Sequence, residues 1–303
     1  MRTTIVMAIA AAMAFGGQQA WAEGYQVNSI SARQNGMGHT GTALKLGAES
    51  QFFNPAGLAF MKGKVDFSGS ITGIFSHVTA THQDKKYDTD SDPATPIGIH
   101  LGMGVYDNLK VGVSFYTPYG SSINWTDNWP GAELNQSVKL KVYTVQPTVA
   151  YKILPNLSVG AGLMVMWGDV DLNKGLLSPK TMDAMLAAQQ LPYRYGDTTP
   201  ASVNLNGQAQ VRCGVNLGVM WDITDKWTVG FDYRSRVNMK VKAGQATLSS
   251  TPLTDQLMQH IPTLQALAMI DRANFSAQMP AAAVYRLGVS YKPIQKLTLA
   301  FDA

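Results

Sequence analysis

The segment from Trp227 to Ala243 limits the possible folds more than any other part of the sequence. Most of its odd-numbered residues are apolar, whereas its even-numbered residues are Thr, Gly, Asp, Arg, Asn and Lys. Successive side chains point to opposite faces only in a β-strand, so the pattern predicts a strand with one apolar face. Residues 203–221 alternate in the same way. Weaker alternation brings the predicted total to about nine strands, the others lying near 65–76, 97–106, 109–116, 143–152, 157–168, 275–292 and 296–302.

The two clearest strands are long enough to cross a membrane. A tilted membrane-spanning strand needs about 9–11 residues, whereas a strand of a soluble sheet usually has about five or six. Short turns also alternate with long connections, and aromatic residues such as Tyr151, Trp221 and Tyr291 stand beside the short turns. Aromatic girdles of this kind mark the interfaces of outer-membrane barrels. The sequence therefore predicts an all-β, antiparallel transmembrane barrel, with a soluble sheet as the alternative.

The composition agrees with a barrel and excludes several other classes. Charged residues make up 15% of the chain, below the roughly 25% of a soluble domain, although hydrophobic residues reach only 46%. The net charge of +4 is too small to indicate nucleic-acid binding, and a single cysteine, Cys213, excludes a disulfide framework. The five histidines have no metal-ligand spacing, and no nucleophile stands beside a base. We therefore expect no enzyme activity, no metal and no cofactor.

Residues 1–22 have the features of a secretory signal peptide. Arg2 precedes a short apolar run that ends at Phe15, and Ala20-Trp21-Ala22 matches a cleavage site. The run is too short to span a bilayer, which takes about 20 residues. Since no later run is long enough either, any crossing of the membrane must use strands.

Two long connections, near 174–200 and 251–272, contain short helical patterns. Residues 179–188 lie between Gly175 and Pro192, and apolar residues recur at helical spacing between Pro252 and Ile270. Both connections fall on the long-loop side of the predicted barrel. Two interpretations stay open, because the helices can pack on each other as a cap or present apolar faces to a greasy ligand.

Residues 23–62 do not alternate and are rich in turn-forming residues. Closely spaced glycines allow a tight backbone approach, and an Asn-Pro pair initiates a turn. A phosphate-binding loop is the weaker alternative, because no strand–helix context and no Lys-Ser/Thr pair follow the glycines. The residues of this motif are Gly36, Gly38, Gly41, Asn54, Pro55 and Ala56.

The same residues carry a resemblance to a known family. The start Glu23-Gly24-Tyr25-Gln26, the stretch Gly36-Met37-Gly38 and the run Phe53-Asn54-Pro55-Ala56-Gly57-Leu58 are similar to the FadL/TodX outer-membrane transporters of long-chain fatty acids and aromatic hydrocarbons. The resemblance implies a 14-stranded barrel (63–303 here) plugged by an N-terminal hatch (23–62), with a ligand groove between two external loops. Family members are longer, so about five C-terminal strands are expected to be missing.

The resemblance and the alternation together suggest functional residues. The predicted groove is formed by apolar side chains of the two long loops, namely Leu176, Leu177, Met182, Met185, Leu186, Leu257, Met258, Leu264 and Leu267. The even-numbered strand face is expected to line the lumen, which places four cations there: Arg212, Arg234, Arg236 and Arg286. These arginines either hold a ligand carboxylate or pair with Asp232 and with hatch groups such as Glu49.

We therefore expect a monomeric outer-membrane protein that takes up long-chain fatty acids or other apolar small molecules passively, in contact with outer-membrane lipid and without nucleic acid. The alternatives are a barrel that binds partners or scaffolds secretion through its external loops, and a porin for polar solutes.

Overall fold

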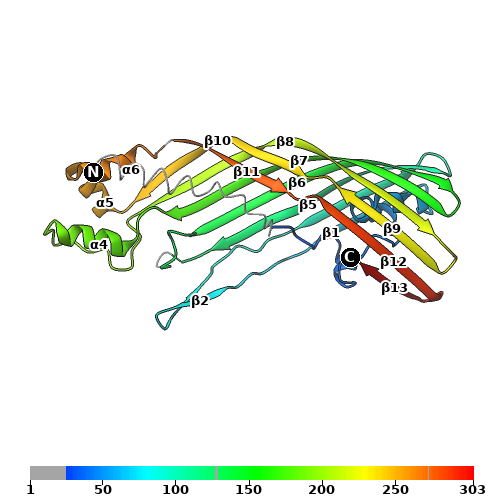
Figure 1. Ribbon diagram of the computed structural model, residues 1–303, viewed down its shortest axis with the longest axis horizontal. Helices are drawn as coiled ribbons and strands as arrows, with labels where there is room; N and C mark the ends of the chain where they lie inside the picture. Colours follow the sequence, from blue (N-terminus) through cyan, green and yellow to red (C-terminus); the bar gives the residue numbers. More distant parts are fainter. Residues whose placement is uncertain (1–24, 127–128, 272) are drawn as a thin grey trace.

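The computed structural model describes residues 25–126, 129–271 and 273–303, so the predicted signal peptide lies outside the described residues. Eleven strands form one curved antiparallel sheet, and a two-stranded hairpin projects from it (Figure 1). The sheet consists of β1 (Val65–Ile71), β4 (Ile97–Gly104), β5 (Leu109–Asn124), β6 (Ser137–Leu154), β7 (Leu157–Gly175), β8 (Ala201–Asp222), β9 (Trp227–Arg234), β10 (Val237–Ser250), β11 (Asn274–Ala281), β12 (Val284–Ile294) and β13 (Leu297–Asp302). The hairpin consists of β2 (Thr79–His82) and β3 (Lys85–Asp88).

The strands follow a simple up-and-down path. The hydrogen-bonded order is β1-β4-β5-β6-β7-β8-β9-β12-β13, with β10 beside β8 and β11 beside β10. The described residues thus contain more strands than the nine that the alternation predicts. Two predicted strands are each divided, into β9 with β10 and β11 with β12, and the hairpin adds two more. The hairpin was missed because its short strands are polar and mostly exposed on both faces.

The outer face of the sheet carries an apolar band. On β8 this band runs from Val211 to Trp221, both of which are exposed. The ten steps between these two residues, at about 3.4 Å each and tilted by about 45°, give a height of roughly 25 Å, which is the height of the lipid-facing band of outer-membrane barrels. Aromatic side chains lie near the short turns at one end of the band, where Trp227 and Tyr291 stack with their ring centroids 4.3 Å apart.

The alternation changes faces halfway along the sheet, and this corrects the sequence prediction. In β9, Asp232 and Arg234 are buried on the inner face, but two residues outside the strands follow, and in β10 Val237 and Met239 are buried instead. The odd-numbered residues of 227–243 were predicted to face lipid along the whole segment. They face outward in β9 but inward in β10. Because the side-chain period is two, one extra residue moves every following side chain to the other face.

A bulge produces the same reversal in β8. Met166 pairs with Arg212 and Gly168 pairs with Ala209, so two residues of β8 lie opposite the single residue Trp167. Ala209 is buried on the inner face, whereas Trp221 on the other side of the bulge is exposed. Bulges insert one unpaired residue and turn the strand in this way.

As a result, the inner face is apolar in the half of the sheet that leads to the long loops. A cluster of buried residues covers it, which we call the inner apolar cluster: Tyr119, Val142, Met164, Met166, Val170, Ala209, Val237, Met239, Val241, Met279 and Ala281. Leu172 packs against this cluster, and its strand partner Leu205 packs against a second cluster among the helices. The two apolar clusters thus meet along β7 and β8.

The predicted helical segments form three helices at one end of the molecule: α4 (Pro179–Ala188), α5 (Pro252–His260) and α6 (Pro262–Ala268) (Figure 1). Ser178 caps α4 by accepting a hydrogen bond from the Thr181 amide at 3.0 Å, and Thr251 caps α5 in the same way. A proline opens each helix, as its fixed φ angle favours. In the described ranges, no helix has the length and apolar character needed to cross a membrane.

Candidate ligand-binding site

The N-terminal segment (residues 25–62) packs against the inner face of the sheet through short helices: α2 (Ala32–Asn35), η2 (Gly47–Glu49), α3 (Ser50–Phe53) and η3 (Pro55–Phe60). Asn54 is its main attachment point and is completely buried. The Asn54 amide nitrogen donates to the Thr42 carbonyl at 2.7 Å and to the Val219 carbonyl of β8 at 3.0 Å. Its side-chain oxygen accepts from the Ala56 amide at 3.1 Å and so caps η3. The Asn54-Pro55-Ala56 run therefore joins this segment to the wall.

Glycines in the wall allow this close approach. A Cβ atom at Gly218 of β8 would collide with Asn54, and one at Gly160 of β7 would collide with Pro55. The glycine stretch of the N-terminal segment is held on another side, because the amides of Gly41 and Thr42 donate to Asp302 Oδ2 at 2.7 and 3.0 Å. Gly36 follows α2, and Gly38 takes a left-handed conformation with φ +66° in the next turn.

A buried charged cluster lies where the N-terminal segment meets β9 and β12. The Asp232 carboxylate is fully buried, 3.7 Å from Arg234 Nε and 3.8 Å from Arg286 Nη1. The guanidinium of Arg234 stands 4.5 Å from the ring centroid of Phe52, and that of Arg286 stands 5.8 Å from it. Both arginines thus contact the wall and the N-terminal segment together.

The charges in this cluster attract one another without forming hydrogen bonds. Separations of 3.7 and 3.8 Å exceed hydrogen-bond length. Within the described residues, both Asp232 oxygens, Arg234 Nε and Nη2, and Arg286 Nη1 have no hydrogen-bond partner. Buried donors without acceptors are costly, so these N–H groups are chemically ready for an anionic acceptor.

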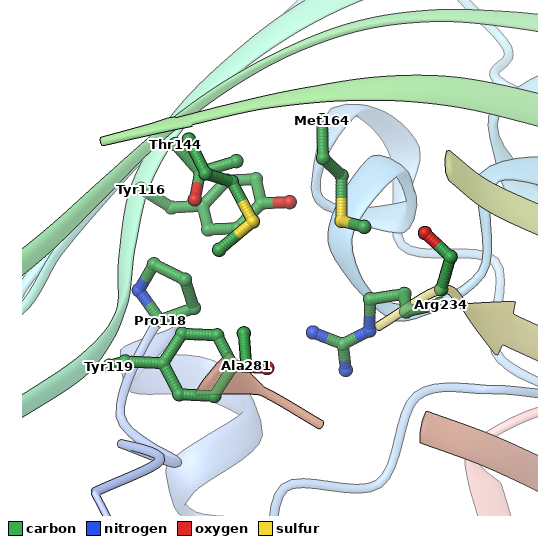
Figure 2. Close-up of a pocket in the computed structure, with 9 residues that line it drawn as sticks. Tyr116, Pro118, Tyr119, Thr144, Met164, Arg234 and Ala281 are labelled. Atoms are coloured by element: carbon green, nitrogen blue, oxygen red, sulfur yellow. The ribbon is translucent and has the colours of Figure 1, made fainter. Parts of the chain in front are cut away.

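A small cavity of about 10 Å³ adjoins Arg234. In Figure 2 the guanidinium of Arg234 and the side chains of Met164 and Tyr119 surround the same space. The cavity is lined by Tyr116, Pro118, Tyr119, Thr144, Met164, Met166, Arg234, Ser235 and Ala281, several of which belong to the inner apolar cluster. It has room for one water molecule, so a larger ligand enters only if these side chains move.

The wall is irregular beside this cavity. Pairing between β5 and β6 skips from Tyr116 to Tyr119, leaving Thr117 and Pro118 outside the ladder. Proline cannot donate a backbone hydrogen bond, so it is favoured at such an interruption. Pro118 and Asp302 were not singled out from the sequence. Ser235 belongs to the run Tyr233-Arg234-Ser235, which resembles a signature of the FadL/TodX family, although the sequence did not predict that Ser235 lines a cavity.

All nine predicted groove residues belong to one cluster beneath the helices. Five of them are buried, namely Met182, Leu186, Leu257, Leu264 and Leu267, and Leu176, Leu177, Met185 and Met258 pack against them. Tyr195, which the sequence did not suggest, joins the cluster and shares a 2.8 Å hydrogen bond with Thr254. The helices therefore pack on each other as a cap in this structure, and the predicted groove residues are in its interior.

The four predicted lumen cations separate into two pairs. Arg234 and Arg286 lie in the buried cluster, whereas Arg212 and Arg236 are exposed and interact with Gln210 at 3.5 Å and with Asn238 at 3.1 Å. Arg236 stands next to the reversal, so the alternation that assigned it to the lumen face no longer applies. Within the described residues, Glu49 accepts hydrogen bonds from Ser31 and Ser68 and forms no ion pair with an arginine.

His39 in the N-terminal segment is a titratable group beside the buried charged cluster. Its ring lies 4.9 Å from Phe53 and 6.0 Å from Phe52. Burial, followed by the positive charges of Arg286 and Arg234, lowers the pKa of His39 to about 4. The imidazole is therefore neutral at neutral pH.

Sequence and structure comparisons define the class of this molecule. Residues 13–303 match the family model described as outer membrane protein transport protein (OMPP1/FadL/TodX). The chain belongs to this family of outer-membrane β-barrel transporters. The prediction of a transmembrane antiparallel barrel that is not an enzyme is confirmed.

The particular relatives are distant. The long-chain fatty acid transport protein of Escherichia coli O6:H1 is 25% identical over 244 residues, which cover 77% of this chain and 54% of that protein. Outer membrane protein P1 of Haemophilus influenzae is 22% identical over 273 residues, covering 80% and 59%. The chain thus spans just over half the length of these relatives.

Solved structures show the same fold. A FadL homologue from Pseudomonas aeruginosa superposes with a TM-score of 0.67 at 17% identity, covering 92% of this chain and 68% of that one. The Pseudomonas putida toluene transporter TodX gives 0.62 at 16% identity, covering 92% and 69%.

Proposed function

We propose that this protein takes up hydrophobic compounds, long-chain fatty acids first among them, by passive passage along its inner face. The observation that carries the proposal is the inner apolar cluster, which begins beneath the helices and ends at Arg234. Burial of an alkyl chain there contributes about 0.8 kcal/mol per CH₂. A relative named as a long-chain fatty acid transport protein and one named as a toluene transporter support the class of ligand.

Each end of this apolar path has its own role in the proposal. The cap residues, including Met182, Leu186, Leu257 and Leu267, separate to admit the ligand, and flexible methionines suit ligands of variable shape. At the inner end, Arg234 and Arg286 receive the carboxylate through donors that otherwise lack acceptors. The N-terminal segment serves as the plug below this point, so small polar solutes do not leak through.

Binding of radiolabelled oleate to the purified chain in detergent tests this function. Arg234→Gln should weaken oleate binding about tenfold or more, because a charge-assisted hydrogen bond contributes about 1.5–3 kcal/mol. Arg212→Gln is the matched control and should change binding by less than about twofold. Equal effects of the two substitutions would remove Arg234 from the site.

The cap is tested by replacing 251–272 with a short Gly/Ser linker. This removes α5 and α6 and should weaken oleate capture, while retained heat-modifiable mobility on gels shows that the sheet remains folded. If the intact chain binds no fatty acid and no aromatic hydrocarbon, the transport proposal is wrong and a non-transport barrel takes its place.

A further inference from the structure

Two neighbouring short turns carry stacked aromatic and exposed apolar side chains. Trp227 and Tyr291 are partners in the β9–β12 register and stack 4.3 Å apart. Ile223 and Ile294 beside them are 48% and 62% exposed. Aromatic rings of this type settle at headgroup depth, and exposed isoleucines at the same level contact lipid tails. The pair therefore marks the edge of the bilayer at the short-turn end.

Three exposed lysines stand at this edge. The Lys292 amide donates to the Lys226 carbonyl at 2.8 Å, so the end of β12 adjoins the turn before β9, and Lys296 lies in the turn that follows β12. We call Lys226, Lys292 and Lys296 the lysine rim. Asp225 is the one carboxylate within the turns 223–226 and 295–296, and the nearby Asp222 already pairs with Lys45. None of the three rim lysines forms an ion pair with a described residue.

Two lysines at the opposite end of the molecule form ion pairs within the chain. Lys85 lies 3.2 Å from Asp197, and Lys139 lies 2.8 Å from Asp92. Hydrogen bonding to Lys139 also holds the pKa of Asp92 below its usual value. The lysine rim instead concentrates positive charge beside a lipid-facing surface without supplying the counter-charge.

We propose that the lysine rim binds the phosphate of an anionic phospholipid in the membrane leaflet at the short-turn end. The acyl chains lie over Ile223 and Ile294, and the stacked Trp227–Tyr291 pair contacts the glycerol region. The membrane is favoured over a soluble acidic partner because the cations lie beside exposed apolar and aromatic side chains, which suit lipid better than water. The site is independent of the transported ligand and extends the function beyond transport to selection of the surrounding lipid.

The test uses the intact chain in nanodiscs of phosphatidylcholine with or without phosphatidylglycerol, followed by native mass spectrometry of the lipids that remain bound. The triple variant Lys226→Gln, Lys292→Gln, Lys296→Gln should retain about fivefold less phosphatidylglycerol than the unmodified chain. A control variant with Lys85→Gln, Lys86→Gln and Lys180→Gln loses the same charge at the helix end and should retain the normal amount. The corresponding Lys→Arg rim variant should retain it as well.

Several results would overturn the proposal. Equal loss in the rim and control variants would show attraction by net charge alone, and unchanged retention in the rim variant would show that these lysines do not bind lipid. Phosphatidylcholine retained as well as phosphatidylglycerol would exclude recognition of the anionic headgroup. Because all six substituted lysines are surface residues, gel mobility before and after heating verifies that each variant is folded before its lipids are counted.

Discussion

The two halves of the inner face differ in what holds them together. Near the short turns, the wall meets the N-terminal segment through polar contacts such as the 2.9 Å hydrogen bond from Ser158 Oγ to the Ala56 carbonyl. Near the helices, the same strands present Val, Met and Ala side chains to one another. One strand therefore serves a polar interior and an apolar interior in turn. The apolar path therefore depends on the bulge in β8 and on the break between β9 and β10, while β7 contributes Met164, Met166 and Val170 from its unchanged inner face.

The largest effect is expected when a charge is placed in the apolar half of the inner face. Met239→Asp buries a carboxylate without a partner, and we expect it to lower the free energy of unfolding by about 3 kcal/mol or more and to abolish oleate binding. Asn238→Asp is the control one residue away, on the exposed face. Urea unfolding in detergent measures both, and similar losses in the two variants would contradict the assigned faces.

A smaller effect is expected from loosening the polar half. Asn54→Ala removes two buried donors that now reach Thr42 and Val219, at a cost of about 2 kcal/mol to the attachment of the N-terminal segment. Hydrogen exchange of 25–62 should accelerate while the strands stay protected, and liposomes should become more permeable to small solutes. Asn156→Ala removes an exposed hydrogen bond to Asp222 and serves as the control. Unchanged exchange in the Asn54 variant would refute the attachment.

The smallest effect is expected from a change of pH, which acts on the N-terminal segment through His39. The pKa of His39 is about 4 in the folded chain and about 6.5 when unfolded, so the unfolded state binds the proton more tightly. The stabilisation is complete above pH 6.5 and is lost as the pH falls toward 4. Exchange of the N-terminal segment should therefore accelerate over this range. His39→Gln should remove that part of the pH dependence, whereas His82→Gln in the exposed hairpin should not; identical profiles would exclude His39.

The barrel could be predicted from the sequence, because long alternation of apolar and polar residues arises only when successive side chains of a strand point to opposite faces. The position of the reversal could not be predicted, because an apolar side chain that faces lipid has the same character as one that faces an apolar interior. Val237 and Phe231 belong to a single odd-numbered series in the sequence, yet one is buried inside and the other is exposed outside. The extra residue at 235–236 carries no glycine or proline to mark it.

The predictions for the candidate site succeeded or failed according to the position of each residue relative to the reversal. Arg234 and Arg286 were predicted at the lumen together with their partner Asp232, because they precede or avoid the reversal. Arg236 lies within it and was misassigned. The groove residues were predicted together because the resemblance implies a groove between the two long loops, and these are apolar side chains of those loops. Neither the resemblance nor helical spacing determines whether the short helices stand apart or pack on each other.

The central claim is that an apolar ligand occupies the inner face above Arg234. A long-chain fatty acid with a diazirine near its methyl end, irradiated on the intact chain in detergent, tests it most directly when the adducts are located by mass spectrometry. The account predicts adducts on Val237, Met239 and Met279 that excess unlabelled oleate removes, and uncompeted adducts on the outward Leu217 and Trp221. Competed adducts found only on Leu217 and Trp221, with none on the inner face, would contradict it.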